Sequence, residues 1–252
     1  CLAMPAAMSL TGGAAGVRQV LARAPQAAVT SACLFGFAWG FGAILFGLSV
    51  DRLGVSLANS LVIGLSSALG SVVPMLLNAG FQLDRKSVIL LLGVLTFLAG
   101  VALCGVAGMK RSSSAAVTAA PLSAYLFCVG SGVMSAIFNI GYSLALPVAS
   151  AGVDTGLSQF AATNIIWLMM LGFGSIPNIV YCGWLLRRNG TAGLYGEQGE
   201  GSRGWMLSVL MGLLWGGSIF LYGAATPRLG NLGPSIGWPL SLAVGLLVAN
   251  SM

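Results

Sequence analysis

The chain contains 252 residues, of which 57% are hydrophobic and 6% are charged, and its mean hydropathy is +0.95. Soluble proteins carry about a quarter of their residues as Asp, Glu, Lys and Arg, so this composition excludes a water-soluble fold and predicts a chain embedded in lipid. The net charge of +6 comes from eleven Lys and Arg that stand between apolar blocks, where they indicate membrane topology rather than nucleic-acid binding.

Residues 1–27 precede the first long apolar stretch and are difficult to place in a membrane. Their first ten residues are apolar, but they are too few to cross a bilayer. This region is expected to be the tail of a truncated helix followed by a loop.

Seven later stretches between charged residues each exceed the roughly 20 residues that a helix needs to cross the hydrocarbon core. Apolar runs of this length without alternation are not barrel strands, and lipid requires that backbone hydrogen bonds be made within the segment. The sequence therefore predicts an all-α, polytopic membrane protein. Its spans are expected near residues 29–50, 55–77, 87–108, 122–146, 161–186, 205–224 and 232–250.

The first and sixth spans contain a repeat. Segment 36–54 aligns without a gap to segment 212–230 at an offset of 176, with eight of nineteen positions identical, Trp39 and Trp215 among them. Duplication explains this agreement better than composition does. Because the two copies are five spans apart, they are expected to cross the membrane in opposite directions, as in the inverted repeats of secondary transporters.

The offset also predicts how the chain is divided. Two units of 176 residues would be longer than the chain, so we expect a fragment with about seven of ten helices. Residues 28–111 would be the last three spans of a first five-helix unit. Residues 112–252 would be four spans of a second unit whose final helix is missing.

Polar side chains within the spans are the candidate binding groups. On the fourth span, the spacing of Ser131, Ser135, Asn139 and Tyr142 places all four on one helix face. They either form interhelical hydrogen bonds or line a cavity that binds a neutral, hydroxyl-rich solute. The predicted substrate-binding residues are Trp39, Ser66, Ser135, Asn139, Tyr142, Asn164, Trp215 and Tyr222.

Trp39 and Trp215 stand in the middle of their spans, where they either fill a packing gap between the repeats or present a flat apolar face to a sugar ring. Both are flanked by G-x-x-x-G spacings, at Gly36 and Gly40 and at 212 and 216, which let helices approach closely.

Three charged residues next to spans receive specific predictions. Arg52 and Arg228 occupy matching positions in the repeat and are expected to complement the carbonyl ends of their helices. Asp154 is either the N-cap of the following helix or a proton carrier.

The residue types exclude several kinds of chemistry. Histidine is absent, and the five cysteines show no C-x-x-C spacing, so neither a metal nor another cofactor is expected. No carboxylate pair and no nucleophile with an adjacent base stand out, which argues against an enzyme.

The order of several short stretches resembles the L-rhamnose-proton symporter family of the drug/metabolite transporter superfamily. These stretches are residues 34–49, 52–56, 134–139 and 151–154, Asn178 and residues 233–238. The resemblance implies a fold of ten helices in two inverted five-helix units. It also implies proton-driven uptake of a small neutral sugar such as L-rhamnose, by alternating access, across a bacterial inner membrane.

The alternative within the superfamily is an exporter of a non-sugar metabolite or drug. In either case the expected partners are a small solute and the lipid bilayer, with protons for the symporter and no nucleic acid. The oligomeric state stays open.

Overall fold

The computed structural model describes residues 13–79, 84–112, 121–196 and 200–251, which are almost entirely helical and contain no strand. The seven long helices correspond to the seven predicted spans. The elements are α2 (Gly13–Arg23), α3 (Gln26–Leu53), α4 (Val55–Ala79), α5 (Arg85–Ser112), α6 (Leu122–Asp154), α7 (Gln159–Asn189), η2 (Thr191–Gly196), α8 (Glu200–Ala225), η3 (Thr226–Leu232) and α9 (Gly233–Ser251).

Six segments of the described chain are long and apolar enough to cross a membrane. They are Gln26–Leu53, Val55–Leu77, Arg85–Ala107, Leu122–Asp154, Gln159–Asn189 and Gly201–Gly245. The last segment contains most of α8 and of α9, which the 3-10 turn η3 separates. Gly230 in that turn has a φ of 64° and a ψ of −148°. The prediction of an all-α, polytopic membrane protein is confirmed.

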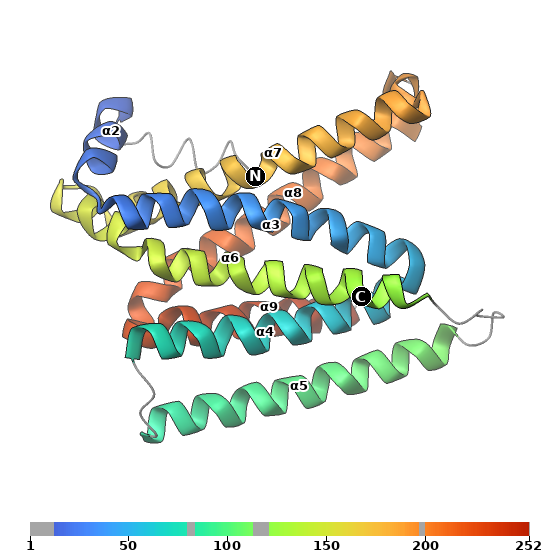
Figure 1. The fold of residues 1–252 in the computed structure, drawn as a ribbon, viewed down its shortest axis with the longest axis horizontal. Coiled ribbons are helices and arrows are strands. Elements are labelled where there is room, and N and C mark those ends of the chain that lie inside the picture. Colours follow the sequence, from blue (N-terminus) through green and yellow to red (C-terminus); the bar gives the residue numbers. More distant parts are fainter. Residues whose placement is uncertain (1–12, 80–83, 113–120, 197–199, 252) are drawn as a thin grey trace.

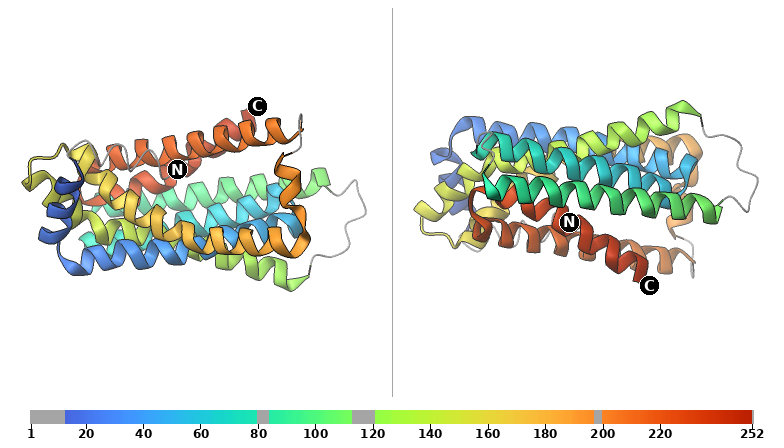
Figure 2. Two further views of the ribbon diagram at one scale, coloured as in Figure 1. Left: turned by 90° about the horizontal axis from the view of Figure 1, so that it is seen from above. Right: turned by 90° about the horizontal axis from the view of Figure 1, so that it is seen from below.

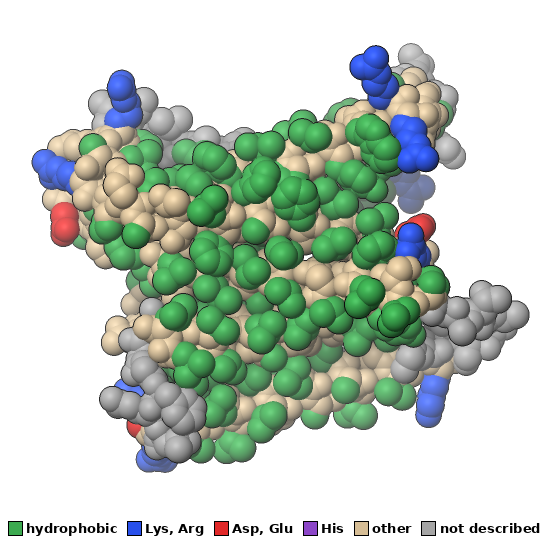
Figure 3. Space-filling model, in the orientation of Figure 1, with side chains coloured by type: hydrophobic (Ala, Val, Ile, Leu, Met, Phe, Trp, Pro, Cys, Tyr) green, Lys and Arg blue, Asp and Glu red, His purple; other side chains and the backbone are tan. Residues whose placement is uncertain are grey.

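Successive long helices run back and forth along one axis (Figure 1). Helices α3, α6, α4 and α5 form one layer, and α8 and α9 lie against it as a second layer (Figure 2). On the face drawn in Figure 3, charged side chains gather at the two ends of this axis, and apolar side chains cover the surface between them. This distribution is the one expected when the axis lies along the membrane normal.

Two predictions about helix ends were wrong. Helix α6 was expected to end near residue 146, but it continues through Pro147 to Asp154, because neighbouring helices in a membrane protein compensate for the backbone donor that proline lacks. Asp154 is therefore the last residue of α6 and not an N-cap. Ser158 caps α7, since its Oγ accepts a hydrogen bond from the Ala161 amide at 3.2 Å.

The region before the first span also differs from its prediction. Residues Gly13–Arg23, expected to be loop, form the short helix α2. Its residue Val20 is buried in the main apolar core, as is Ala24, which follows it. The predicted tail of a truncated helix falls within residues 1–12, outside the described residues.

Charged side chains stabilise two helix starts. Arg52 lies in the last turn of α3, at the carbonyl end where it was expected. Its guanidinium donates to Ser123 Oγ at 2.8 Å and lies over the Phe127 ring. These contacts join α3 to the start of α6. At α5, Asp84 Oδ1 accepts from the Ser87 amide at 2.8 Å. Hydrogen bonds from the Ser87 side chain and backbone hold the pKa of the Asp84 carboxyl below its ordinary value.

Glycines bring α3 and α7 into backbone contact. A Cβ on Gly36 would collide with the backbone of Met170, and one on Gly40 would collide with the carbonyl oxygen of Gly174. The repeated spacing on α8 is used differently, because a Cβ on Gly216 would meet nothing within 4 Å. Only the first copy of the G-x-x-x-G pattern therefore makes a close helix contact at its second glycine.

This difference predicts unequal effects of matched substitutions. Gly40→Ala should destabilise the protein by roughly 1–3 kcal/mol, the usual cost of overpacking a tight contact. Gly216→Ala should be neutral or stabilising by up to about 1 kcal/mol, because alanine is the better helix former. Thermal unfolding in detergent measures both variants, and equal losses would contradict the α3–α7 contact.

Candidate functional site

The predicted polar face of α6 contacts neighbouring helices at each of its four positions. Ser131 Oγ donates to the Gly42 carbonyl oxygen on α3 at 2.9 Å. Ser135 and Asn139 contact α4, and Tyr142 lies against rings of α7 and α8. The helical spacing thus correctly predicted which side chains of α6 face protein rather than lipid.

Asn139 connects four helices through a single side chain. Its Nδ2 donates to the carbonyl oxygens of Gly70 on α4 at 2.7 Å and of Pro234 on α9 at 3.0 Å. Its Oδ1 accepts a hydrogen bond from the hydroxyl of Tyr222 on α8. The amide is fully buried, and both of its donor hydrogens and its oxygen are used.

A second hydrogen-bonded chain lies beside Asn139. The indole Nε1 of Trp238 on α9 donates to Ser66 Oγ on α4 at 3.1 Å. The Ser66 hydroxyl in turn donates to Ser135 Oγ on α6 at 2.9 Å. Trp238 also packs over the backbone of α4, where a Cβ on Gly70 would lie 2.7 Å from the indole ring.

Aromatic rings extend from this polar cluster to the pair of repeated tryptophans. The Trp39 and Trp215 rings are stacked, with centroids 5.5 Å apart and planes at 11°. Trp39 also contacts Phe138 at 4.8 Å between centroids. Trp215 is 37% exposed, so the ring stack runs from the buried cluster toward the surface of α8.

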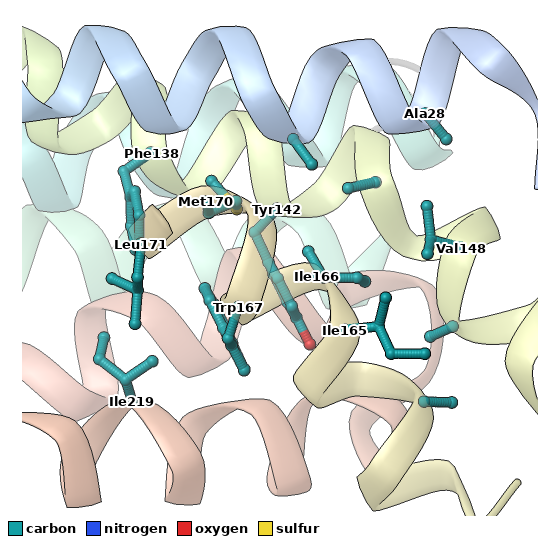
Figure 4. Close-up of a cluster of buried hydrophobic side chains, with 14 of the residues drawn as sticks. Ala28, Phe138, Tyr142, Val148, Ile165, Ile166, Trp167, Met170, Leu171 and Ile219 are labelled. Carbon is teal, nitrogen blue, oxygen red and sulfur yellow. The ribbon is translucent and has the colours of Figure 1, made fainter. Parts of the chain in front are cut away.

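Tyr142 and Asn164 occupy the part of the cluster nearest α7. The Tyr142 ring stacks on Trp167 with centroids 4.3 Å apart and planes at 4° (Figure 4). Asn164 is buried, and its Nδ2 donates to the Phe160 carbonyl oxygen of its own helix at 2.8 Å. The Tyr142 hydroxyl and Asn164 Oδ1 have no hydrogen-bond partner.

The structure therefore brings the eight predicted substrate-binding residues into one region. Seven of them directly contact at least one other residue of the set. Asn164, the exception, lies one turn before Trp167 on α7. Asp154 is separate from them, exposed at the end of α6. The prediction missed Phe138, Trp167 and Trp238, although each is an aromatic residue in or next to a stretch already rich in polar side chains.

A groove on the described residues lies apart from this cluster. It has a volume of about 1010 Å³ and lies between α5 and α9, with Asp84 and Lys86 at one end and mainly apolar side chains along its length. The polar cluster itself is closed, since Ser66, Asn139 and Tyr222 are all buried.

The polar side chains of the cluster are amides, hydroxyls and indoles, all of them neutral groups. Such groups donate and accept hydrogen bonds, as the hydroxyls of a neutral solute also do. Among the described residues, no group of three His, Cys, Asp or Glu could hold a metal ion.

Comparison with known proteins gives one family. The sequence model of a family described as L-rhamnose-proton symport protein (RhaT) matches residues 18–252. Curated relatives named L-rhamnose-proton symporter from Citrobacter koseri, Escherichia coli O1:K1 / APEC and Escherichia coli strain K12 / DH10B are each 25% identical over 224 residues. The alignments cover 85% of this chain and 65% of each relative, and no solved structure matches.

The hydrogen bonds of Asn139 predict a large effect of its removal. Asn139→Ala should destabilise the protein by about 1–3 kcal/mol, because the Tyr222 hydroxyl and two carbonyl oxygens lose a partner in a buried site. Tyr222→Phe should cost less, about 0.6 kcal/mol, because it removes a single interhelical bond.

Chemical unfolding in detergent measures these differences. Ser175→Ala is the control, since Ser175 Oγ bonds only to the Gly172 carbonyl of its own helix. If Asn139→Ala were no more harmful than Ser175→Ala, the four-helix connection would not stabilise the fold.

Proposed function

Because the chain belongs to the L-rhamnose-proton symport protein (RhaT) family, we propose that it forms the greater part of a secondary transporter for a small neutral sugar of the L-rhamnose type. It is a multi-pass protein of a bacterial inner membrane. The chain spans about 65% of the length of its curated relatives, and those relatives are named for symport of L-rhamnose with protons.

The observation that carries this proposal is the closed cluster around Asn139. A sugar presents several hydroxyls and apolar ring faces, and the cluster offers hydrogen-bonding groups from α4, α6, α8 and α9 beside stacked tryptophans. Uncharged amides and hydroxyls suit a neutral solute. An exporter of lipophilic drugs would be expected to have a site lined mainly by Phe, Met and Leu, which this cluster does not match.

We also propose that α3–α5 and α6–α9 belong to two inverted five-helix units, 28–111 and 112–252, of a ten-helix drug/metabolite transporter fold. Figure 1 shows α3 and α8 running in opposite directions. Trp39 and Trp215, which match each other in the repeat, are in direct contact. Equivalent residues touch in this way where a two-fold axis passes between them, and such an axis in the membrane plane is typical of inverted repeats.

The uneven covering of the two repeats supports this division. Helix α3 is packed against α6 and α7, whereas α8 makes few contacts and exposes apolar side chains along much of its length. Under the proposed symmetry, α8 would be covered by the two helices of the first unit that correspond to α6 and α7.

Alternating access would then act on bonds that cross between the units. The Asn139 amide bond to Gly70 and the Ser66 bonds to Ser135 and Trp238 all join the first unit to the second. For the units to rock around a bound sugar, these bonds must break on one side. Sugar hydroxyls can replace the lost partners, which lowers the cost of opening.

Transport tests the proposal directly. The full-length protein in proteoliposomes should accumulate labelled L-rhamnose when the outside is acidified, and a protonophore should abolish the accumulation. Asn164→Ala should reduce uptake, because Asn164 Oδ1 is an unpaired buried acceptor. Accumulation of a lipophilic cation in place of the sugar would overturn the proposal in favour of the exporter.

We propose Asp154 as the proton carrier. It is the last residue of α6 and the only acidic residue of that helix. The sequence has no Asp, Glu or His in the middle of a span. Asp154→Asn should abolish accumulation driven by a pH gradient but preserve sugar counterflow, which needs no net proton movement.

Asp84→Asn is the matched control for this variant. Asp84 is an exposed carboxylate at the same end of the bundle, in the connection between α4 and α5. If Asp154→Asn accumulated sugar as well as Asp84→Asn does, Asp154 would not carry the proton.

A further inference from the structure

Three polar atoms in neighbouring turns of α6 and α7 are buried without a hydrogen-bond partner. They are the Tyr142 hydroxyl, Trp167 Nε1 and Asn164 Oδ1. The other buried indole of the cluster, that of Trp238, has a partner in Ser66. Because unpaired buried polar groups are costly and native proteins contain few of them, three together indicate a site whose partner is a ligand.

The Trp167 ring is already stacked against other aromatic rings. Trp167 stacks on Tyr142 with centroids 4.3 Å apart and on Phe138 with centroids 5.7 Å apart. A sugar therefore has no free face of Trp167 on which to stack. The indole can instead offer its N–H edge, and Tyr142 its hydroxyl, as hydrogen-bond donors.

Helix α8 closes the edge of this aromatic pair. A Cβ added to Gly223 would collide with Trp167 Nε1, and it would lie 3.2 Å from Thr163 Cγ2. The indole N–H is thus held against a part of α8 that has no side chain. The neighbouring residue Tyr222 packs on Tyr142 with ring centroids 5.3 Å apart.

Helix α8 is also the element best placed to move away. It makes few contacts with α7 and α9, and it leads into the η3 turn, where Gly230 adopts a backbone conformation outside the helical region. A displacement of α8 would uncover the Tyr142 hydroxyl and Trp167 Nε1 together, because both face it at Tyr222 and Gly223.

We propose that Tyr142, Trp167 and Asn164 form a sugar subsite that is closed by Gly223 of α8 in this structure. The Tyr142 O–H and Trp167 N–H donate to sugar hydroxyl oxygens, and Asn164 Oδ1 accepts from a sugar hydroxyl. This inference rests on the proposed transport of a neutral sugar, and it assigns Trp167 as a specificity-determining residue.

The test compares binding of L-rhamnose and its monodeoxy analogues to the purified full-length protein by titration calorimetry. Trp167→Phe keeps a stacking ring and removes the N–H, and it should weaken L-rhamnose binding roughly 3- to 10-fold, the loss of one hydrogen bond. One deoxy analogue, which lacks the hydroxyl that meets the N–H, should bind wild type and Trp167→Phe equally. The other analogues should still show the loss.

The control is Trp184→Phe, an indole half-exposed at the far end of α7, which should leave every affinity unchanged. If Trp167→Phe weakened all ligands by one common factor, or none, the subsite would be refuted although the protein still bound sugar. If wild type bound no sugar, the proposed function itself would fail. Tyr142→Phe, tested on the same analogues, gives an independent result should Trp167→Phe not fold.

Discussion

The buried amide of Asn139 is the interaction on which the arrangement of the second layer depends. In a lipid environment, apolar surface provides little preference for one helix over another, so packing and interhelical hydrogen bonds decide which helices meet. Asn139 offers two donors and an acceptor, and each is satisfied by a different helix, at Gly70, Pro234 and Tyr222. Its position on α6 thereby sets where α4, α8 and α9 approach one another.

The same region combines rigid and adjustable parts. The contact of α3 with α7 at Gly36 and Gly40 is backbone against backbone, and such close packing cannot change without separating the helices. By contrast, α8 is held at Tyr222 and at the Trp39–Trp215 stack and is otherwise sparsely covered. The proposed transport would use both kinds of contact, since a fixed scaffold must carry the site while another element opens it.

Much of the candidate site could be predicted from helical spacing and from the repeat. The spacing of Ser131, Ser135, Asn139 and Tyr142 correctly indicated one protein-facing side of α6. The repeat indicated that Trp39 and Trp215 belong to antiparallel helices. Neither argument could find Trp167 or Trp238, because an aromatic residue in an apolar span has the same local pattern whether it faces lipid, core or ligand.

By itself, the sequence determined the membrane class and the approximate positions of the long apolar helices, because hydropathy is a property of local composition. It also indicated that the two repeated segments run in opposite directions, because they are an odd number of spans apart. Tertiary structure alone decided which polar groups found partners. Ser66 pairs with Trp238 while the Trp167 indole and the Tyr142 hydroxyl stay unpaired, and that outcome depends on how each helix is rotated and how far it lies from its neighbour. A sequence pattern places a side chain on one face of a helix, but a hydrogen bond requires the donor and acceptor atoms of two side chains or backbones to lie about 3 Å apart.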